Sequence, residues 1–244
     1  MNFMSNSLTD QLKSLVRGFI QRQGIMVKHY PLQHFLRWIH PTTILDVGAN
    51  VGQYGRELRS LGYQGKIQSF EPFPPAFNTL QQVAAKSRPA NAWQAHNFGL
   101  GEKEGKAVMN VSRDSCFNSL REPLPESTGL DARIAASTTV SVNIRTLEFV
   151  WRELNLSGEH VFLKMDTQGY ELPILKGGMT VLEKISGIQL EVSLTPLYKN
   201  QPCVEEVVPF LRHCGFVIFG VWPGEGIRGK HKEIYEVDFL FVMP

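Results

Sequence analysis

The chain has 244 residues, a mass of 27.6 kDa, 43% hydrophobic residues and 20% charged residues, which is the balance of an ordinary globular protein. This composition excludes a disordered chain, a coiled coil and a collagen-like fibre. The 25 Lys and Arg residues nearly balance the 23 Asp and Glu residues, so the net charge is only +2 and no nucleic-acid partner is expected.

The cysteines, the apolar runs and the N-terminal residues indicate the cellular compartment. Cys116, Cys203 and Cys214 are odd in number and lack the C-x-x-C spacing of zinc sites, so we expect free thiols in a reducing compartment. No apolar run is long enough to span a bilayer, and residues 1–10 lack the features of a secretory signal. These observations favour a cytoplasmic protein.

The N-terminal forty residues predict a helical extension. Residues 8–20 carry apolar side chains at helical spacing beside several basic ones, which indicates an amphipathic helix. Such a helix packs on its own domain, on a second subunit or on a membrane surface; we favour packing, and a homodimer through this helix is one such arrangement. A second helix is expected from about Leu32 to Ile39, ending before Pro41. Residues 1–40 thus form the extension and residues 41–244 the main domain.

After residue 40, strand and helix patterns alternate. Seven strands are expected at 44–47, 66–70, 92–98, 160–165, 187–192, 216–221 and 237–242. Helices are expected at 54–61, 76–86, 146–154, 172–184 and 204–213. This alternation of strands and helices predicts an α/β fold with a mainly parallel sheet and helices on both faces. The last two strands have no helix between them, so they should pair antiparallel.

Two long connections are expected to border a binding site. Segments 106–111 and 139–144 predict a hairpin, and the polar segment 112–138 between them is too long for a simple turn. We expect this segment to be a lid or acceptor loop; the alternative is a disordered surface insertion. The loop 222–232 is a second candidate wall, where Trp222 either stacks on a sugar or belongs to the core.

Acidic residues close four of the expected strands. In an open α/β sheet, ligands bind beyond the carboxyl ends of the strands. Asp46, Glu71, Asp166 and Glu191 stand at those ends. Four carboxylates make a poor phosphate site, but they suit a ligand with hydroxyl, ammonium and sulfonium groups.

The sharpest local signal follows the first strand, where residues 46–54 read Asp-Val-Gly-Ala-Asn-Val-Gly-Gln-Tyr. Glycines at a strand-to-helix turn allow a tight turn and a close approach of the backbone to a ligand. Asn50 replaces the second glycine of the dinucleotide pattern G-x-G-x-x-G, which disfavours a nicotinamide cofactor. Glu71, about twenty residues after this turn, takes the position that binds ribose hydroxyls. Together these residues predict a nucleoside site.

A family resemblance runs from about Ile44 to the C-terminus. Besides residues 46–54, it rests on Ser-Phe-Glu-Pro (69–72), Asn-Phe-Gly-Leu-Gly-Glu (97–102), Lys-Met-Asp-Thr-Gln-Gly-Tyr-Glu (164–171) and Leu-Lys-Gly-Gly (175–178). In order and spacing these blocks resemble the FkbM family of S-adenosylmethionine-dependent methyltransferases. One departure is Gln168, where many relatives have Glu.

The resemblance implies a class I methyltransferase fold, which is Rossmann-like, with a seven-stranded sheet whose last strand is antiparallel. It also implies that residues 41–244 bind S-adenosylmethionine and methylate a hydroxyl, often of a sugar in a bacterial glycan or a natural product. The expected partner is therefore a small-molecule or glycan hydroxyl acceptor. We expect the cofactor to be bound by Asp46, Gly48, Asn50, Gly52, Tyr54, Glu71, Pro72, Asn97 and Asp166.

Methyl transfer to a hydroxyl needs a base that takes the hydroxyl proton. Asp166 is the first candidate for this base, and its alternative role is to orient the acceptor or the methionine moiety. Lys164, on the same side of the strand, would lower the basicity of Asp166. Glu171 either binds the substrate or stabilises a helix start. His96 is the one histidine to test as a base, although a structural role is favoured for it.

Other functions stay open at this point. A magnesium site on Asp166 and Glu191 lacks a third ligand with recognisable spacing, so no metal is expected. A nicotinamide (NAD(P))-dependent oxidoreductase on a related sheet and a non-catalytic nucleoside-binding protein are the alternatives to a methyltransferase.

Overall fold

The computed structural model describes residues 31–224 and 233–244. The helix expected over residues 8–20, the homodimer expected through it and most of the loop 222–232 lie outside these residues, and they stay predictions. The chain divides into two compact units, Met1–Trp38 and Ile39–Pro244. Helix α2 (Pro31–Ile39) confirms the helix expected before Pro41.

The second unit contains a seven-stranded sheet. Its strands are β1 (Thr43–Val47), β2 (Lys66–Phe70), β3 (Trp93–His96), β7 (Val161–Met165), β8 (Ile185–Ser193), β9 (Val217–Pro223) and β10 (Glu236–Val242). Their order is β3-β2-β1-β7-β8-β10-β9; β10 runs antiparallel to both of its neighbours, and the other neighbouring strands pair parallel. This arrangement confirms the mainly parallel sheet and the antiparallel pairing of the last two strands.

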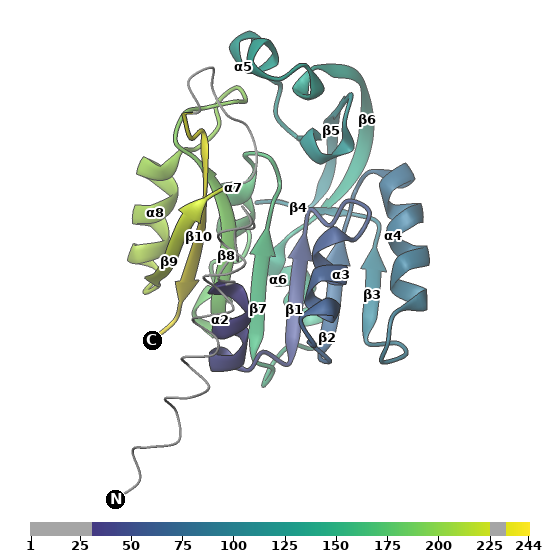
Figure 1. Cartoon of the computed structure of the whole chain (residues 1–244), viewed down its shortest axis with the longest axis vertical. Coiled ribbons are helices and arrows are strands. Elements are labelled where there is room, and N and C mark those ends of the chain that lie inside the picture. Colours follow the sequence, from purple (N-terminus) through teal and green to yellow (C-terminus); the bar gives the residue numbers. More distant parts are fainter. Residues whose placement is uncertain (1–30, 225–232) are drawn as a thin grey trace, which may run out of the picture. The chain divides into compact units, whose positions relative to one another are not determined.

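Helices lie on both faces of this sheet, as expected; α3 is in front of it and α6 behind it in Figure 1. Because both faces are covered, every residue of β1 and of β7 is buried, which explains their nearly continuous apolar sequences. The helices are α3 (Gln53–Ser60), α4 (Pro74–Lys86), α6 (Leu147–Glu153), α7 (Glu171–Lys176) and α8 (Val204–His213), with a short 3₁₀ turn η3 (Leu182–Lys184).

Two expected elements are shorter in the structure. The third strand ends at His96, because the chain leaves the sheet there to enter a second sheet. The helix expected over 172–184 ends at Lys176, where Gly177 and Gly178 follow. A Cβ on Gly177 would lie 2.1 Å from the carbonyl oxygen of Gly101, and one on Gly178 would lie 2.5 Å from Leu147. The glycine pair is therefore needed for close packing, and it interrupts the helix.

The contact at Gly177 leads to a stability prediction. Gly177→Ala should lower the free energy of unfolding by about 1–3 kcal/mol, because its new methyl group overlaps backbone atoms that must move. Gly129→Ala is the matched control: Gly129 is exposed in a helix, no atom lies within 4 Å of its added Cβ, and a slight gain is expected. Urea unfolding of the two variants measures both effects, and equal stabilities would contradict the packing role of Gly177.

The second sheet confirms the expected hairpin. It consists of β4 (Gly99–Leu100), β5 (Gly105–Ser112) and β6 (Ala136–Arg145), in the order β4-β6-β5. β5 and β6 are antiparallel, with Lys106 opposite Asn143, while the pairing of β4 with β6 was not predicted.

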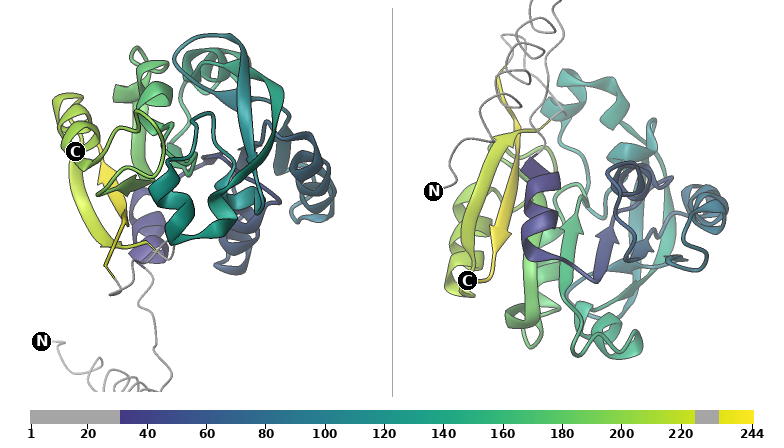
Figure 2. Two further views of the ribbon diagram at one scale, coloured as in Figure 1. Left: turned by 90° about the horizontal axis from the view of Figure 1, so that it is seen from above. Right: turned by 60° about the horizontal axis from the view of Figure 1, so that its bottom comes forward.

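Residues 113–135, which we call the insert, connect β5 to β6. The insert contains η1 (Ser115–Phe117), α5 (Pro125–Leu130) and η2 (Ala132–Ile134), none of which was predicted. Figure 1 places α5 beyond the arrowheads of β1 and β7, and the left view of Figure 2 shows the insert from above. Phe117 and Ile134 pack with Leu197 and Tyr198 in a small core, so the insert is an ordered part of the fold and not a disordered insertion.

Candidate active site

One cavity, about 540 Å³ in volume, lies beyond the carboxyl ends of β1, β2 and β7. β1 and β7 are adjacent in the sheet, and the strand order reverses between them, which is where ligands bind in open α/β sheets. Seven of the residues expected from the sequence line this cavity: Gly48, Asn50, Tyr54, Glu71, Pro72, Lys164 and Asp166.

The two glycines after β1 have different roles. Gly48 has a φ of +76°, and a Cβ there would lie 1.9 Å from the carbonyl oxygen of Asp166, so the loops after β1 and β7 meet only because this residue is glycine. Gly52, with φ +87°, caps α3 and faces Leu80 and Trp93 instead of the cavity. Gly52 thus has a role in the turn, and its expected contact with a cofactor stays a prediction.

Glu71, at the end of β2, is held by two backbone amides. The N–H of Asn50 donates to Oε2 and the N–H of Phe73 donates to Oε1, each at 2.8 Å. Burial, opposed by these two donors, raises the pKa of Glu71 to about 7. Each carboxylate oxygen has a further lone pair, so the group can accept additional hydrogen bonds from a ligand.

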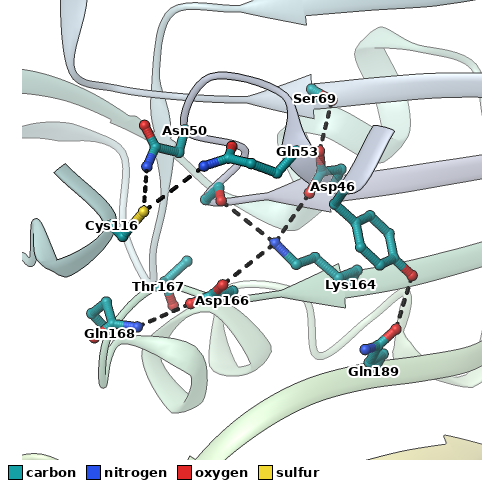
Figure 3. Close-up of polar contacts among 12 residues, drawn as sticks. Asp46, Asn50, Gln53, Ser69, Cys116, Lys164, Asp166, Thr167, Gln168 and Gln189 are labelled. Atoms are coloured by element: carbon teal, nitrogen blue, oxygen red, sulfur yellow. Dashed lines mark hydrogen bonds and ion pairs between the residues drawn. The ribbon is translucent and has the colours of Figure 1, made fainter. Parts of the chain in front are cut away.

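A polar chain crosses the sheet from β2 to the cavity (Figure 3). Asp46 lies beside Ser69 on one neighbouring strand and beside Lys164 on the other. The Ser69 hydroxyl donates to Asp46 Oδ2 at 2.9 Å, and Lys164 Nζ lies 3.2 Å from Asp46 Oδ1. Lys164 Nζ also lies 3.9 Å from Oδ2 of Asp166, whose side chain is 43% exposed. Asp46 is fully buried and does not line the cavity; its expected contact with a cofactor stays a prediction.

Lys164 is charged although it is buried. Burial alone would lower the pKa of Lys164, but the carboxylates of Asp46 and Asp166 outweigh it, and the net effect raises this pKa. Its Nζ also lies 5.2 Å from the centre of the Tyr54 ring, a cation–π contact. A buried ammonium with two carboxylates leaves one net negative charge, which Asp166 presents at the cavity.

Three other expected site residues do not line the cavity. His96 stacks on Phe70 at 4.9 Å and bonds Gln68 at 2.7 Å, and burial lowers its pKa, so it is a structural histidine. Asn97 donates to the carbonyl oxygens of Glu71 and Pro72 and braces that loop. Glu171 is the third of these residues, and its Oε1 accepts hydrogen bonds from the N–H and the hydroxyl of Thr167.

Sequence reasoning missed part of the acidic side of the cavity. Gln189, Glu236 and Asp238 line it together with Glu191. Asp238 lies opposite Glu191 in the antiparallel pair of β10 and β8. Burial, followed by the charge of Asp166, raises the pKa of Asp238 to about 6 and that of Glu191 well above its usual range. The missed signal was the presence of polar residues at alternate positions in two otherwise apolar strands.

The insert closes the cavity on the side of the glycine loop. The Ser115 hydroxyl donates to Asn50 Oδ1 at 3.0 Å. Asn50 Nδ2 donates to Cys116 Sγ at 3.1 Å (Figure 3). Segment 115–120 lines the cavity, in agreement with the expected lid or acceptor loop. Trp222, in β9, is half-buried and lies outside the lining, so it offers no stacking surface there.

Two features are absent from residues 31–224 and 233–244, the part of the chain that the structure describes. No group of three or more His, Cys, Asp or Glu side chains is arranged to hold a metal ion in this part of the chain. Within the same ranges, every helix is too short or too polar to cross a membrane.

Proteins similar to this chain include two methyltransferases of known sequence and one of known structure. Methyltransferase sdnD of Sordaria araneosa is 29% identical over 153 residues, which cover 55% of this chain and 59% of sdnD. 2-O-methyltransferase NoeI of Sinorhizobium fredii is 23% identical over 212 residues, which cover 84% of this chain and 85% of NoeI. The crystal structure of Methyltransferase FkbM from Methylobacillus flagellatus superposes with a TM-score of 0.51 at 16% identity, over 82% of this chain and 43% of that one.

These comparisons differ in what they establish. The chain spans about three fifths of sdnD and less than half of the M. flagellatus protein, and the structural likeness concerns the fold alone, a class I methyltransferase fold. The methyltransferase FkbM domain, by contrast, matches residues 46–218, which is most of the chain and includes every motif around the cavity. This chain therefore belongs to the FkbM family of methyltransferases.

Proposed function

We propose that this methyltransferase uses S-adenosylmethionine to methylate a hydroxyl group of a small, hydroxyl-rich acceptor such as a sugar. The observation that carries the proposal is that Glu71 and Asp166 line one cavity from opposite sides of the β1 loop. One carboxylate suits ribose hydroxyls, and the other suits the proton of an acceptor hydroxyl.

The residues around the β1 loop fit this cofactor. S-Adenosylmethionine supplies, when bound, a methyl group on a positively charged sulfur. The buried Glu71 carboxylate has only two donors, so two ribose hydroxyls would complete its hydrogen bonds. The single net negative charge of the Asp46, Lys164 and Asp166 group favours a cation at the same end of the cavity. Asn50 and Tyr54 border the same space.

The other side of the cavity fits an acceptor with several hydroxyl groups. Glu191, Glu236, Asp238 and Gln189 supply hydrogen-bond acceptors there. The exposed Asp166 carboxylate is the proposed base that receives the hydroxyl proton, and residues 115–120 of the insert line the same cavity. The relative NoeI, named as a 2-O-methyltransferase, supports transfer to oxygen.

A cytoplasmic location is part of the proposal. Cys116, Cys203 and Cys214 are all free thiols, which fits a reducing compartment.

Calorimetry and a product assay test the function in two steps. Titration with S-adenosylmethionine and, separately, with NADH should give binding of the first compound only. Incubation with S-adenosylmethionine and a panel of sugars should then release S-adenosylhomocysteine, and mass spectrometry should find one added methyl group on the acceptor. Binding of NADH alone would contradict the proposal, and cofactor binding with methylation only of amines would contradict oxygen as the target.

The insert gives a prediction about dynamics. We expect the amides of segment 115–121 to exchange more slowly when S-adenosylhomocysteine and the acceptor are both bound, because lid segments become ordered over occupied sites. Hydrogen exchange measures this, with helix α8, which does not line the cavity, as the internal control. Equal exchange of segment 115–121 in the free and doubly liganded protein would reduce the insert to a fixed wall.

A further inference from the structure

The buried side chain of Gln168 joins Asp166 to a buried tyrosine. Gln168 is 8% exposed; its Nε2 donates to Asp166 Oδ1 at 3.1 Å, and its Oε1 accepts from the hydroxyl of Tyr198 at 3.0 Å. The opposite orientation of the amide would place Oε1 against the Asp166 carboxylate, so the neighbours select the one observed. The Asp166 carboxylate thus has a fixed donor on one oxygen.

The backbone around Gln168 is held as firmly as its side chain. Gln168 has a φ of +52°, in the left-handed backbone region that residues other than glycine and asparagine seldom adopt. The Ser119 hydroxyl donates to the carbonyl oxygen of Gln168 at 2.7 Å, and Arg121 Nε donates to that of Gly169 at 2.6 Å. Both donors belong to the insert, so the insert and Tyr198 together fix the amide in place.

We propose that Gln168 is a positioning residue that keeps Asp166 ionised and directs one of its oxygens to the acceptor, a role that rests on the proposed function. Its donor occupies Oδ1, and a hydrogen bond to a carboxylate favours the ionised form. Oδ2 is left with the ion pair to Lys164 Nζ at 3.9 Å, which is longer than a hydrogen bond. Oδ2 is therefore the oxygen that can take a hydroxyl proton.

Gln168 differs from the Glu that many relatives have in this place, because an amide cannot take up a proton. A glutamate in the same position would set a second carboxyl group against Oδ1, and two acids at that distance share one proton. Six other titratable groups interact electrostatically with Asp166. They are Lys164 in β7, Cys116 in η1, Glu171 in α7, Glu191 in β8, Tyr198 after β8 and Asp238 in β10. Only Lys164 among them is a cation, so the Gln168 donor matters for the charge on Asp166.

Carboxyl-carbon NMR of the ligand-free protein tests this role without an acceptor. The sequence has six aspartates, so aspartate labelled with ¹³C gives few signals, and Asp166→Asn assigns the one of interest. In Gln168→Glu, the titration midpoint of the Asp166 signal should rise by about one pH unit or more. In Gln168→Met, which removes the donor and adds no acid, it should rise by less. Gln94→Glu, at an exposed position of β3, adds the same charge and should not change the titration midpoint of the Asp166 signal.

A kinetic measurement separates positioning from a general structural effect. With an acceptor from the product assay, the acid limb of the kcat profile of Gln168→Glu should move to higher pH, with activity recovering above it. A merely structural role would lower kcat equally at every pH, and would overturn the proposal. An Asp166 signal that titrates at the same pH in wild type, Gln168→Glu and Gln168→Met would also overturn it. Because the NMR arm needs neither cofactor nor acceptor, a protein without methyl-transfer activity contradicts the proposed function and not this result.

Discussion

Asp166→Asn should lower kcat by about two orders of magnitude or more and leave cofactor affinity nearly unchanged. The substitution keeps the size of the side chain and one oxygen for the Gln168 donor, but it removes the basicity that the acceptor hydroxyl needs. A positioned base contributes roughly 10²–10⁴-fold to such a proton transfer. Steady-state kinetics gives kcat, and calorimetry gives the dissociation constant of S-adenosylmethionine.

The control for this substitution is Glu183→Gln, which removes one exposed carboxylate outside the cavity. Its kcat should equal that of the wild type. Normal turnover by Asp166→Asn, or complete loss of cofactor binding, would show that Asp166 is not the base. Asp238, whose pKa burial raises to about 6, would then be the next residue to substitute, because it lines the cavity and His96 does not.

Glu71→Ala should weaken the binding of S-adenosylmethionine by about 2–4 kcal/mol, which is roughly 30- to 1000-fold in the dissociation constant. The loss of affinity comes from the two hydrogen bonds of the ribose. The backbone amides of Asn50 and Phe73 lose their acceptor with and without ligand, which lowers stability. Calorimetry measures the affinity, and Glu183→Ala should not change it. Unchanged affinity in folded Glu71→Ala would show that the ribose is held elsewhere.

The raised pKa of Glu71 predicts how cofactor binding responds to pH. Burial raises the pKa of this carboxyl from its ordinary 4.5 to about 7, so without ligand its ionisation costs stability. The contribution of Glu71 to folding is complete below pH 4.5 and is lost as the pH rises through about 7. Ribose hydroxyls favour the ionised form, so cofactor affinity should increase over the same range, and binding near neutral pH should release protons. Calorimetry in buffers of different ionisation enthalpy measures that release.

The strands and most helices could be predicted because their signals are local. The apolar residues of β1 and β7 and the glycine turn after β1 identify a parallel sheet and its ligand edge without tertiary information. The helix predicted over 172–184 was too long. Gly177 and Gly178 end it because they pack closely against Gly101 and Leu147, which are distant in the sequence. The second sheet was only half predicted for a similar reason: two residues, Gly99 and Leu100, are too few to show a pattern.

The site residues, too, could be predicted only where local sequence identifies them. Glu71 and Asp166 could be identified because each ends a recognisable strand, and strand ends meet at one edge. Asp46 also ends a strand, yet its side chain points to Lys164, and only the register of β1 against β7 reveals that pairing. Glu236 and Asp238 were missed because β10 runs antiparallel, which brings its beginning, and not its end, to the cavity.

The way the insert is attached determines how this fold can change over evolution. The ladder of β5 and β6 holds the two ends of the insert together, with Val111 opposite Thr138 and Ser112 opposite Ala136. When the ends of a loop are already fixed, doubling its length costs only about 0.6 kcal/mol of closure entropy. New residues can therefore be added between β5 and β6 while the seven-stranded sheet, with its cofactor edge, keeps its register. We expect such additions to be tolerated outside segment 115–121, whose Ser119 and Arg121 hold the loop of Gln168.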